Sequence, residues 1–540
     1  MIGRSVPLTS EGITPLLAQN RAYFDRAASA ALNAAHSGRS EQAMLWTKLA
    51  ADCAWHMHPG FYIHPPLEEM LRELGQSLSG VSTAELPPLP TRKEGAKTWL
   101  HLITTAYMTG GHTRLVEKLI VNANDGNEDQ HSILLIDQGK QSIPSWLFDA
   151  AHSSGGTLIN LPEESSLVDR ALAVRHIAHE WADRVILHVH PNDPVAPVAF
   201  APAGGPPVIF VNHADHVFWL GAGCVDVVAD IRPEGHDITV GRRGDIPSII
   251  VPIPLDPPAS SISVAEARSL LGIAANEVVL IAIASHRKFA PYGGLDFPAN
   301  AAKILLRHTE AILLVVGPAA TDPHWQNAVE LAGGRLRLLG VQKEIEPYYV
   351  AADICLESYP FGSLTSTFDA MLRGVPVIRA PRGVPPVFTM SDYDGLGKTS
   401  IDSQEYLLRV SELITDSSLR KDTGERQRKA VTAIHTGSGW CNSWQGLVAK
   451  IPASHTPALK MDSRPWDNFS ELDLVWSDLQ VRQSFIRPDK ETYFKKRISK
   501  IHRQSSRVFL FFKFLSAIVR GNWKGARTRL RNIKQLSAFL

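Results

Sequence analysis

Asp353 to Ile378 reads DICLESYPFGSLTSTFDAMLRGVPVI, and this stretch decides the fold. A short apolar run ends in a turn, and an apolar helical pattern begins at three hydroxyl residues, Thr365, Ser366 and Thr367. Arg-Gly-Val-Pro then closes the helix. An apolar strand followed at once by a helix predicts one unit of a parallel sheet whose faces are covered by helices.

The same alternation continues outward in both directions. EVVLIAIASH, AILLVVGP and RLRLLG are apolar runs separated by helical patterns such as NAAKILLRH. Further towards the N-terminus, TWLHLITTAY, SILLIDQ, TLINLPE, RVILHVHPND and PPVIFVNHADHVFWLG repeat it. The proline-rich stretch PIPLDPPASSIS, Pro252 to Ser263, separates the two series. The sequence therefore predicts an α/β fold with two tandem Rossmann-like, doubly wound domains joined by a hinge.

Four regions follow from these boundaries. Residues 1–90 read as helices, because apolar positions recur at helical spacing, and ELPPLPTRKEG forms a linker. We expect the N-terminal Rossmann-like domain at 95–255, the C-terminal one at 263–455, and a basic amphipathic tail at 456–540. A chain of 540 residues is too long for a single core, which agrees with this division.

Composition excludes several other classes of protein. The chain is 44% hydrophobic and 20% charged, which is ordinary for a folded protein. Its four cysteines form no CxxC pair, which argues against a disulfide framework or a zinc site and suits a reducing cytosol. The beginning MIGRSVPLTSEGITPLL has no apolar core of signal-peptide length, and no stretch approaches a membrane span.

The opening stretch also has the chemistry of a phosphate site. A helix N-terminus presents unpaired N–H groups and a partial positive charge, and small hydroxyl residues add donors there. The loop after EVVLIAIAS supplies His286, Arg287 and Lys288, whose cations suit a diphosphate. Asp369, one turn into the helix, could accept bonds from ribose hydroxyls. The alternative is that the hydroxyl residues only cap the helix and the cations only face solvent.

PFG, the hydroxyl residues and the run D-A-M-L-x-G-V-P-V-I resemble the donor-site signature of GT-B glycosyltransferases, nearest to the bacterial and O-GlcNAc-transferase-like group with its T-T-x-T-D-x-L-x-x-G-x-P pattern. The resemblance spans about Lys97 to Ile451. It implies a nucleotide-sugar donor, with Gly362, Thr365, Ser366 and Thr367 at the diphosphate. It further implies that Asp369 lies at the ribose and that Lys288 and Arg287 neutralise the negative charge of the phosphate groups.

One departure from the resembling enzymes bears on stereochemistry. Many retaining GT-B enzymes carry E-P-F-G-x-x-x-x-E, but here Tyr359 precedes Pro360 and the second acid is Asp369, with extra residues between. This difference favours inversion at the anomeric centre.

The first domain is expected to supply the acceptor face. TAYMTGGHTRLVEKL places Gly110 and Gly111 after the first strand, where they allow a sharp turn and close approach to a ligand. In the resembling family a histidine of this loop lies near the reacting centre, so His112 is the first candidate for the general base. Imidazole suits that task because its ordinary pKa is near neutral.

VNHADHVFWLG, Val211 to Gly221, follows another strand. It supplies His213 and Asp215 as reserve bases, and Phe218 or Trp219 could stack on an acceptor. HVHPND adds more histidine and aspartate nearby, but no H-x-x-x-H or D-x-D spacing occurs, so we expect no metal and no cofactor. The plainer alternative is that these loop histidines bond backbone carbonyls.

The tail has an unusual charge. From Lys490 to Leu540 there are fourteen lysines and arginines against one acid, Glu491, although the whole chain has a net charge of only +1. RVFLFFKFLSAIV mixes aromatic residues with cations, which is typical of an interfacial helix on an anionic membrane. The alternative is that the apolar run packs on the rest of the folded protein and that the cations face solvent. No nucleic-acid motif accompanies the charge.

These observations predict a cytoplasmic glycosyltransferase, peripheral on the inner face of the plasma membrane, that uses a nucleotide-diphosphate sugar, with a UDP-sugar favoured. Its acceptor would be a glycan, a lipid-linked molecule or a protein, in a setting such as polysaccharide biosynthesis. Two alternatives stay open. A UDP-sugar 2-epimerase on the same fold would need carboxylates around the sugar, and a non-catalytic binding protein would use the helical N-terminus to recruit a partner.

Overall fold

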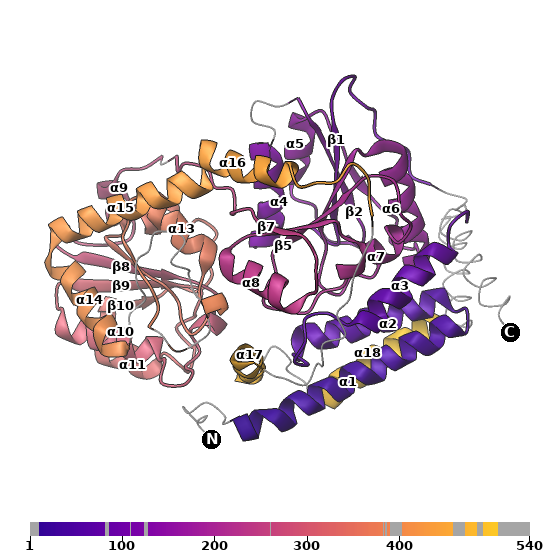
Figure 1. The fold of residues 1–540 in the computed structure, drawn as a ribbon. Helices are drawn as coiled ribbons and strands as arrows, with labels where there is room; N and C mark the ends of the chain where they lie inside the picture. The colour runs from indigo at the N-terminus through magenta and orange to yellow at the C-terminus, as the bar shows by residue number, and fades with distance from the viewer. Residues whose placement is uncertain are drawn as a thin grey trace, which may run out of the picture.

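The structure is a computed structural model that describes residues 10–81, 86–108, 110–123, 128–259, 261–381, 383, 386–388, 402–456, 470–482 and 490–505. The predicted interfacial helix after Arg507 lies outside these residues. None of the described helices is long and apolar enough to cross a membrane. Two α/β units lie side by side, and a group of helices from both ends of the chain packs below the first unit (Figure 1).

The predicted N-terminal helices are present. They are α1 (Ser10–His36), α2 (Ser40–His56) and α3 (Pro65–Ser77). α1 and α2 form a hairpin whose facing side chains are mostly alanine, such as Ala31 and Ala50, so the two backbones approach closely. Glu68 of α3 accepts the backbone N–H groups of Gly221 and Gly223 at 2.9 and 3.0 Å, which ties this helix to the first unit.

The first unit contains a seven-stranded parallel sheet in the order β3-β2-β1-β4-β5-β6-β7. The strands are β1 (Thr98–Ile103), β2 (Gln130–Leu135), β3 (Leu158–Asn160), β4 (Arg184–His188), β5 (Val208–Asn212), β6 (Val227–Asp230) and β7 (Ser248–Ile250). The helices are α4 (Gly111–Ala123), α5 (Ser145–Ser153), α6 (Leu167–Trp181), α7 (Val195–Ala199) and α8 (Pro233–Arg242). β6 and β7 were not among the predicted strands.

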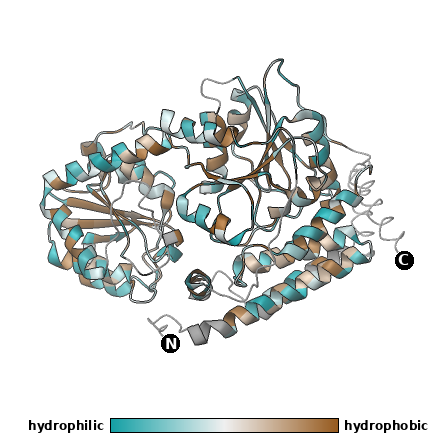
Figure 2. Cartoon of the chain, viewed as in Figure 1, coloured by the Kyte–Doolittle hydropathy of each residue, from teal (hydrophilic) through white to brown (hydrophobic). Residues whose placement is uncertain are grey.

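The second unit contains a five-stranded parallel sheet in the order β10-β9-β8-β11-β12. The strands are β8 (Val278–Ile283), β9 (Ala311–Val316), β10 (Leu336–Leu338), β11 (Ile354–Leu356) and β12 (Val377–Ile378). The helices are α9 (Val264–Leu270), α10 (Phe297–Arg307), α11 (Gln326–Ala332), α12 (Glu346–Ala351), α13 (Leu364–Leu372) and α14 (Ser403–Thr415). The strands of both sheets are coloured as predominantly hydrophobic in Figure 2, as buried parallel strands should be.

Both sheets have a point where the strand order reverses. In the first sheet it lies between β1 and β4, and in the second between β8 and β11. Doubly wound sheets bind ligands beyond the carboxyl ends of their strands at this point. The predicted α/β fold class is confirmed in its two tandem Rossmann-like, doubly wound units and in the helices added at both ends.

The last helices connect the parts of the molecule. α15 (Ser417–His435) and α16 (Gly437–Val448) run from the second unit back to the first (Figure 1). α17 (Glu471–Arg482) lies between the two units and the N-terminal helices, and α18 (Lys490–Ser505) packs along α2. The chain after the second sheet therefore contributes to both units.

Candidate active site

His112 lies in the first turn of α4, after β1, and has a defined orientation. Gly110, at φ 110°, makes the turn that only glycine adopts without strain, and α4 then begins at Gly111. The Nε2 atom of His112 lies 2.8 Å from the backbone oxygen of His188. A carbonyl can only accept, so Nε2 carries the proton of the neutral ring and Nδ1 keeps its lone pair. Burial lowers the pKa of His112, although this bond opposes the shift.

Two more histidines surround His112. The His213 ring, after β5, has its centroid 4.2 Å from that of His112, and the His190 ring, after β4, lies at 5.8 Å. Tyr107 stacks on His190 at 5.8 Å with its own ring partly exposed. The loops after β1, β4 and β5 thus gather imidazole and phenol groups at the carboxyl edge of the first sheet, as predicted for His112 and His213.

A buried row of three histidines beneath this cluster was not predicted. His101 of β1 bonds His131 of β2 at 2.9 Å and His188 of β4 at 3.1 Å. Burial holds the pKa of all three rings below the usual range, to about 3 for His131. The row fixes His188, whose backbone oxygen orients His112. The signal in the sequence was the alternation in TWLHLI, QHSILL and RVILH, where histidine stands on a face that otherwise carries apolar residues.

Asp215 is the predicted reserve base, and its carboxylate is engaged. It pairs with Arg232 through two bonds of 2.6 and 3.0 Å and with His216 at 3.1 Å. Burial alone would raise the pKa of Asp215, but the Arg232 guanidinium and the His216 bond hold it well below the usual range. Arg232 also donates to the backbone oxygen of Val387 in the second unit at 2.6 Å. The carboxylate thus positions a cation that spans the two units.

The prediction that Phe218 or Trp219 stacks on an acceptor is wrong. Both side chains are fully buried. The Phe218 ring packs on Phe24 of α1, and the Trp219 ring stacks on Phe210 of β5 at 4.2 Å. The sequence does not distinguish an aromatic pair that faces a ligand from one that packs inside the protein. Here both rings are packed inside the protein, and Phe218 lies against the N-terminal helices.

Lys288 lies in the second unit at the predicted position. It belongs to the 3₁₀ turn η2 (His286–Phe289) after β8, directly at the reversal point of the sheet. Its Nζ donates to the backbone oxygen of Gly362 at 2.6 Å and lies 4.9 Å from the centre of the Phe361 ring. Burial and the neighbouring Arg232 lower the pKa of Lys288 to about 8, despite the opposing charge of Glu357. Arg287, the other predicted cation, is partly exposed in the same turn.

The three hydroxyl residues at the start of α13 do not behave alike. Thr365 is exposed. Ser366 donates its hydroxyl to the backbone oxygen of Ile283 at 2.8 Å, and Thr367 is buried and bonds the oxygens of Ser363 and Leu364. The Thr367 side chain therefore closes the helix start from within and cannot also hold a ligand. Thr365 and the backbone N–H groups of the first turn stay available.

Asp369 follows one turn later and is partly buried. Burial raises the pKa of its carboxyl group, while Arg373 and Lys118 of α4 oppose the shift. Among the described residues its carboxylate accepts no hydrogen bond, so it can accept from the hydroxyls of a ligand. Lys118 belongs to α4, so Asp369 lies near enough to the first unit for a charge there to act on it.

The carboxyl edges of the two sheets meet at one place, which we call the junction: the loop of Ala214–Val217, the loop of Tyr359–Gly362 and the 3₁₀ turn η4 (Pro386–Phe388). His216 contacts Phe361 at 5.4 Å and Phe388 at 6.0 Å. The charge of Lys288 is close enough to lower the pKa of His216 further, beyond the effect of burial. His216 of the first unit and Lys288 of the second thus lie on the two sides of one junction.

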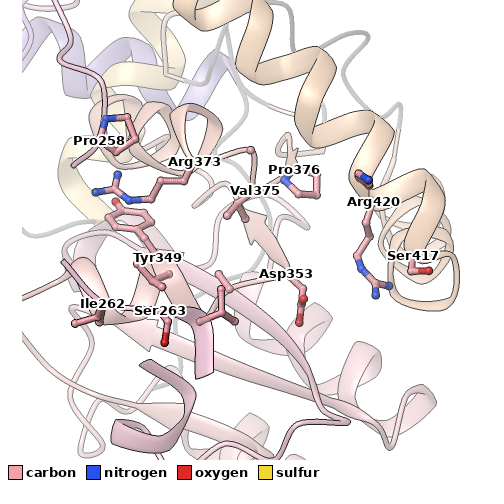
Figure 3. A pocket seen from close by; sticks show the side chains of 15 residues that line it. Pro258, Ile262, Ser263, Tyr349, Asp353, Arg373, Val375, Pro376, Ser417 and Arg420 are labelled. Carbon is pink, nitrogen blue, oxygen red and sulfur yellow. The ribbon is translucent and has the colours of Figure 1, made fainter. Parts of the chain in front are cut away.

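A defined cavity lies elsewhere in the second unit. It has a volume of about 600 Å³ and is formed by α9, α12, α15 and the segment that precedes β12 (Figure 3). Asp353 and Pro376 in its wall precede strands β11 and β12, so it opens at the amino edge of the second sheet. Arg373 lies over the Tyr349 ring there. This cavity is at the opposite edge from Lys288 and is separate from the junction.

In the part of the chain that the structure describes, no three histidine, cysteine or acidic side chains are grouped so that they could hold a metal ion. The independence from metal that the sequence suggests stays a prediction.

No family model and no curated protein matches the chain. Solved structures of similar fold include an O-GlcNAc transferase mutant of Thermobaculum terrenum, at 14% identity and TM-score 0.45, covering 77% of this chain and 81% of that one. HepE of Anabaena, solved with UDP and glucose, has 15% identity and TM-score 0.48, covering 65% and 98%. A glycosyltransferase of Rickettsia africae has 14% identity and TM-score 0.49, covering 66% and 98%.

Proposed function

We propose that the protein is a glycosyltransferase that uses a nucleoside-diphosphate sugar. The observation that carries this proposal is the position of Lys288 beside the start of α13, at the reversal point of the second sheet and close to His216 of the first unit. A cation and a helix N-terminus together favour a diphosphate. A base beside the acceptor hydroxyl, on the side away from the diphosphate, is what inverting transfer requires.

In this proposal the diphosphate binds between Lys288 and the backbone N–H groups at the start of α13. Thr365 can donate to a phosphate oxygen, and Asp369 can accept from the ribose hydroxyls. When the anomeric carbon–oxygen bond breaks, the electron pair stays on the diphosphate. Lys288 and the helix dipole stabilise that added charge, which is larger in the transition state than in the bound donor.

His112 is the base of the proposed reaction. Its Nδ1 lone pair takes the proton of the acceptor hydroxyl as the oxygen bonds to the anomeric carbon, and the ring becomes an imidazolium. The backbone oxygen of His188 continues to accept from Nε2 in both forms. Attack from the side opposite the diphosphate inverts the anomeric centre. His213 packs on the His112 ring and limits its rotation.

The tail supports a proposal about location. α18 docks on the body through Phe494, Ile498 and Ile501, and Tyr493 bonds Asp52 of α2. Lys495 and Lys496 of the same helix are exposed. We infer that this basic face and the following segment hold the enzyme on the anionic inner surface of a cytoplasmic membrane, where each such cation contributes about 1 kcal/mol.

A flotation assay tests this location. Protein lacking the residues after Arg503 should remain unbound, whereas the full chain floats with vesicles of mixed neutral and anionic lipid at low salt and less so at high salt. The Lys495→Gln/Lys496→Gln variant should show a partial loss. Equal flotation of the full and shortened chains would contradict the proposal.

The activity itself is tested with purified protein and a panel of UDP- and GDP-sugars, with and without glycan and lipid-linked acceptors. We expect one donor to raise the unfolding temperature, as a ligand of the native state must, and its nucleoside diphosphate to be released when the right acceptor is added. Conversion of the donor alone into another sugar nucleotide would instead indicate an epimerase. No thermal shift with any donor would contradict the proposal.

A further inference from the structure

Lys288 is held in place by a series of contacts that extends beyond the second unit. Lys288 donates to the backbone oxygen of Gly362 and lies over the Phe361 ring. The backbone N–H of Gly362 in turn donates to the backbone oxygen of Phe388 at 2.5 Å. The position of the lysine therefore depends on the Phe361–Gly362 turn, and that turn depends on Phe388 of η4.

Trp476 of α17 packs on both aromatic rings of this arrangement. It stacks on Phe388 with centroids 5.3 Å apart and planes 24° apart, and it lies 6.2 Å from Phe361. It also makes an edge-on contact with His216 of the first unit at 5.0 Å. The Trp476 side chain is only 3% exposed, so these contacts fill its surroundings. Offset aromatic pairs of this kind fix relative orientation as well as burying area.

α17 is itself fixed from the opposite side. Asp473, fully buried, accepts from His58 at 2.7 Å and from Arg242 of α8 at 3.1 Å. Gln480 donates to the backbone oxygen of Trp55 and accepts the backbone N–H of His58, both at 2.7 Å. The helix is thus bonded to the N-terminal helices and the first unit, while its tryptophan reaches the donor turn of the second.

We propose that Trp476 is a positioning residue for Lys288: α17 presses the Phe361–Gly362 turn against η4 and so places the lysine for the diphosphate. The inference rests on the proposed function. It assigns the N-terminal helices and the segment after the second sheet a direct part in donor binding, because they hold the helix that carries Trp476. The donor site then requires three parts of the chain that are far apart in the sequence.

Binding of UDP by titration calorimetry tests the proposal in the full-length protein. Trp476→Ala should weaken binding about tenfold or more, as expected when a charge-assisted hydrogen bond loses its geometry. Trp476→Phe, which keeps a ring against Phe388, should stay within about twofold of wild type. Glu471→Ala, at an exposed position of the same helix, is the matched control and should change nothing.

A double-mutant cycle separates positioning from general stability. If Trp476 acts through Lys288, Lys288→Ala/Trp476→Ala should bind UDP no more weakly than Lys288→Ala alone. Additive losses would overturn the proposal, as would wild-type affinity in Trp476→Ala. Should Trp476→Ala fail to fold, Trp476→Leu, which keeps apolar volume without a ring to stack, takes its place in the cycle.

Hydrogen exchange gives a readout that needs no nucleotide. Peptides covering residues 358–368 should exchange faster in Trp476→Ala than in Glu471→Ala, because the bond of Gly362 to Phe388 is loosened. Unchanged exchange there overturns the positioning role whatever the enzyme binds. Faster exchange in a protein that binds no nucleoside diphosphate would leave this role standing and refute the proposed function.

Discussion

The two ring nitrogens of His112 have different roles. One nitrogen donates to a backbone carbonyl, which cannot change its role, and the other keeps a lone pair. Burial lowers the pKa of the ring, so it is neutral at physiological pH and able to accept a proton. The tautomer needed for a base is thus set by the backbone of His188.

Replacing His112 by alanine should greatly slow turnover but leave nucleotide affinity nearly unchanged. The loss in kcat should be about 100-fold to 10,000-fold, the usual contribution of a general base, because the diphosphate is held by the other unit. Steady-state kinetics with calorimetry of UDP measures both quantities. His324→Ala, at an exposed position of the second unit, is the control. Near-wild-type turnover in His112→Ala would remove His112 from the mechanism.

Lys288 makes nucleotide binding depend on pH in a defined direction. Its pKa, lowered to about 8, means that the charged form is present below pH 8 and is lost above it. Affinity for UDP should therefore fall as pH rises from 7 to 9. Calorimetry across this range should show the fall in wild type and a flatter profile in Lys288→Arg, since guanidinium stays charged. A wild-type affinity that is constant to pH 9 would contradict this assignment.

The side chains explain which parts of the site could be read from the sequence. The topology of the sheets already places three of the side chains at the carboxyl edges. Lys288 follows a strand directly, and His112 and Asp369 lie near the start of a helix that follows a strand. Thr367 reads like Thr365 but turns inward, and that choice depends on bonds to Ser363 and Leu364. Side-chain rotation of this kind leaves no periodic signal.

At the scale of elements, the proline-rich segment that the sequence predicts as a hinge is held by hydrogen bonds. The backbone oxygen of Pro252 accepts from the Trp440 indole at 2.7 Å, and that of Ile253 bonds His435 at 2.8 Å. Leu255 donates its N–H to the backbone oxygen of His435. α15 and α16 therefore hold the first part of the segment to the returning chain, so any closure of the two units must move these helices as well.

Substitutions at Trp440 test how much the contact between α16 and the proline-rich segment contributes to stability. Trp440→Phe should lower the free energy of unfolding by about 1 kcal/mol, because one neutral hydrogen bond is lost. Trp440→Ala should lower it by about 3–5 kcal/mol, because the indole is almost fully buried against Trp444. Urea unfolding gives both values, with Trp146→Phe, on partly exposed α5, as the control. Equal stability of Trp440→Ala and wild type would contradict a fixed linker.

Several elements were beyond reach of sequence reasoning for physical reasons. β6 has only four residues and β7, at the edge of the sheet, only three, so little apolar length marks them. α17 has no periodic apolar face, and its contacts with Phe388 and His58 join residues about 90 and 400 positions away. By contrast, long buried strands such as β1 and β9 were evident from their continuous apolar runs.

At the scale of the whole molecule, the row of buried neutral histidines in the first unit makes stability depend on pH. The row consists of His101, His131 and His188. Each has a pKa below its value in the unfolded chain, so the unfolded state binds more protons as pH falls below about 6.5. These groups stabilise the fold fully above that pH, and this contribution is lost on acidification. The buried Glu68 carboxyl, with its pKa raised by burial to about 7, has the opposite sign. A single-residue comparison is therefore needed.

His131→Gln isolates one member of the histidine row. Its pKa of about 3 in the fold means that wild type should lose about 2 kcal/mol between pH 7.5 and pH 5 through this group alone. The variant lacks that loss, so the difference in unfolding free energy between wild type and His131→Gln should shift by this amount. Urea unfolding at the two pH values measures it. A difference independent of pH would mean that the ring is already charged in the fold.

We propose above all that the turn at Lys288 and the start of α13 bind a nucleoside diphosphate. Titration of wild-type protein and Lys288→Ala with UDP, and with GDP for comparison, tests it most directly. We expect saturable binding of one of these nucleotides to wild type and an affinity at least about tenfold weaker in Lys288→Ala. Absence of binding to wild type, or equal affinity in the two proteins, would contradict it.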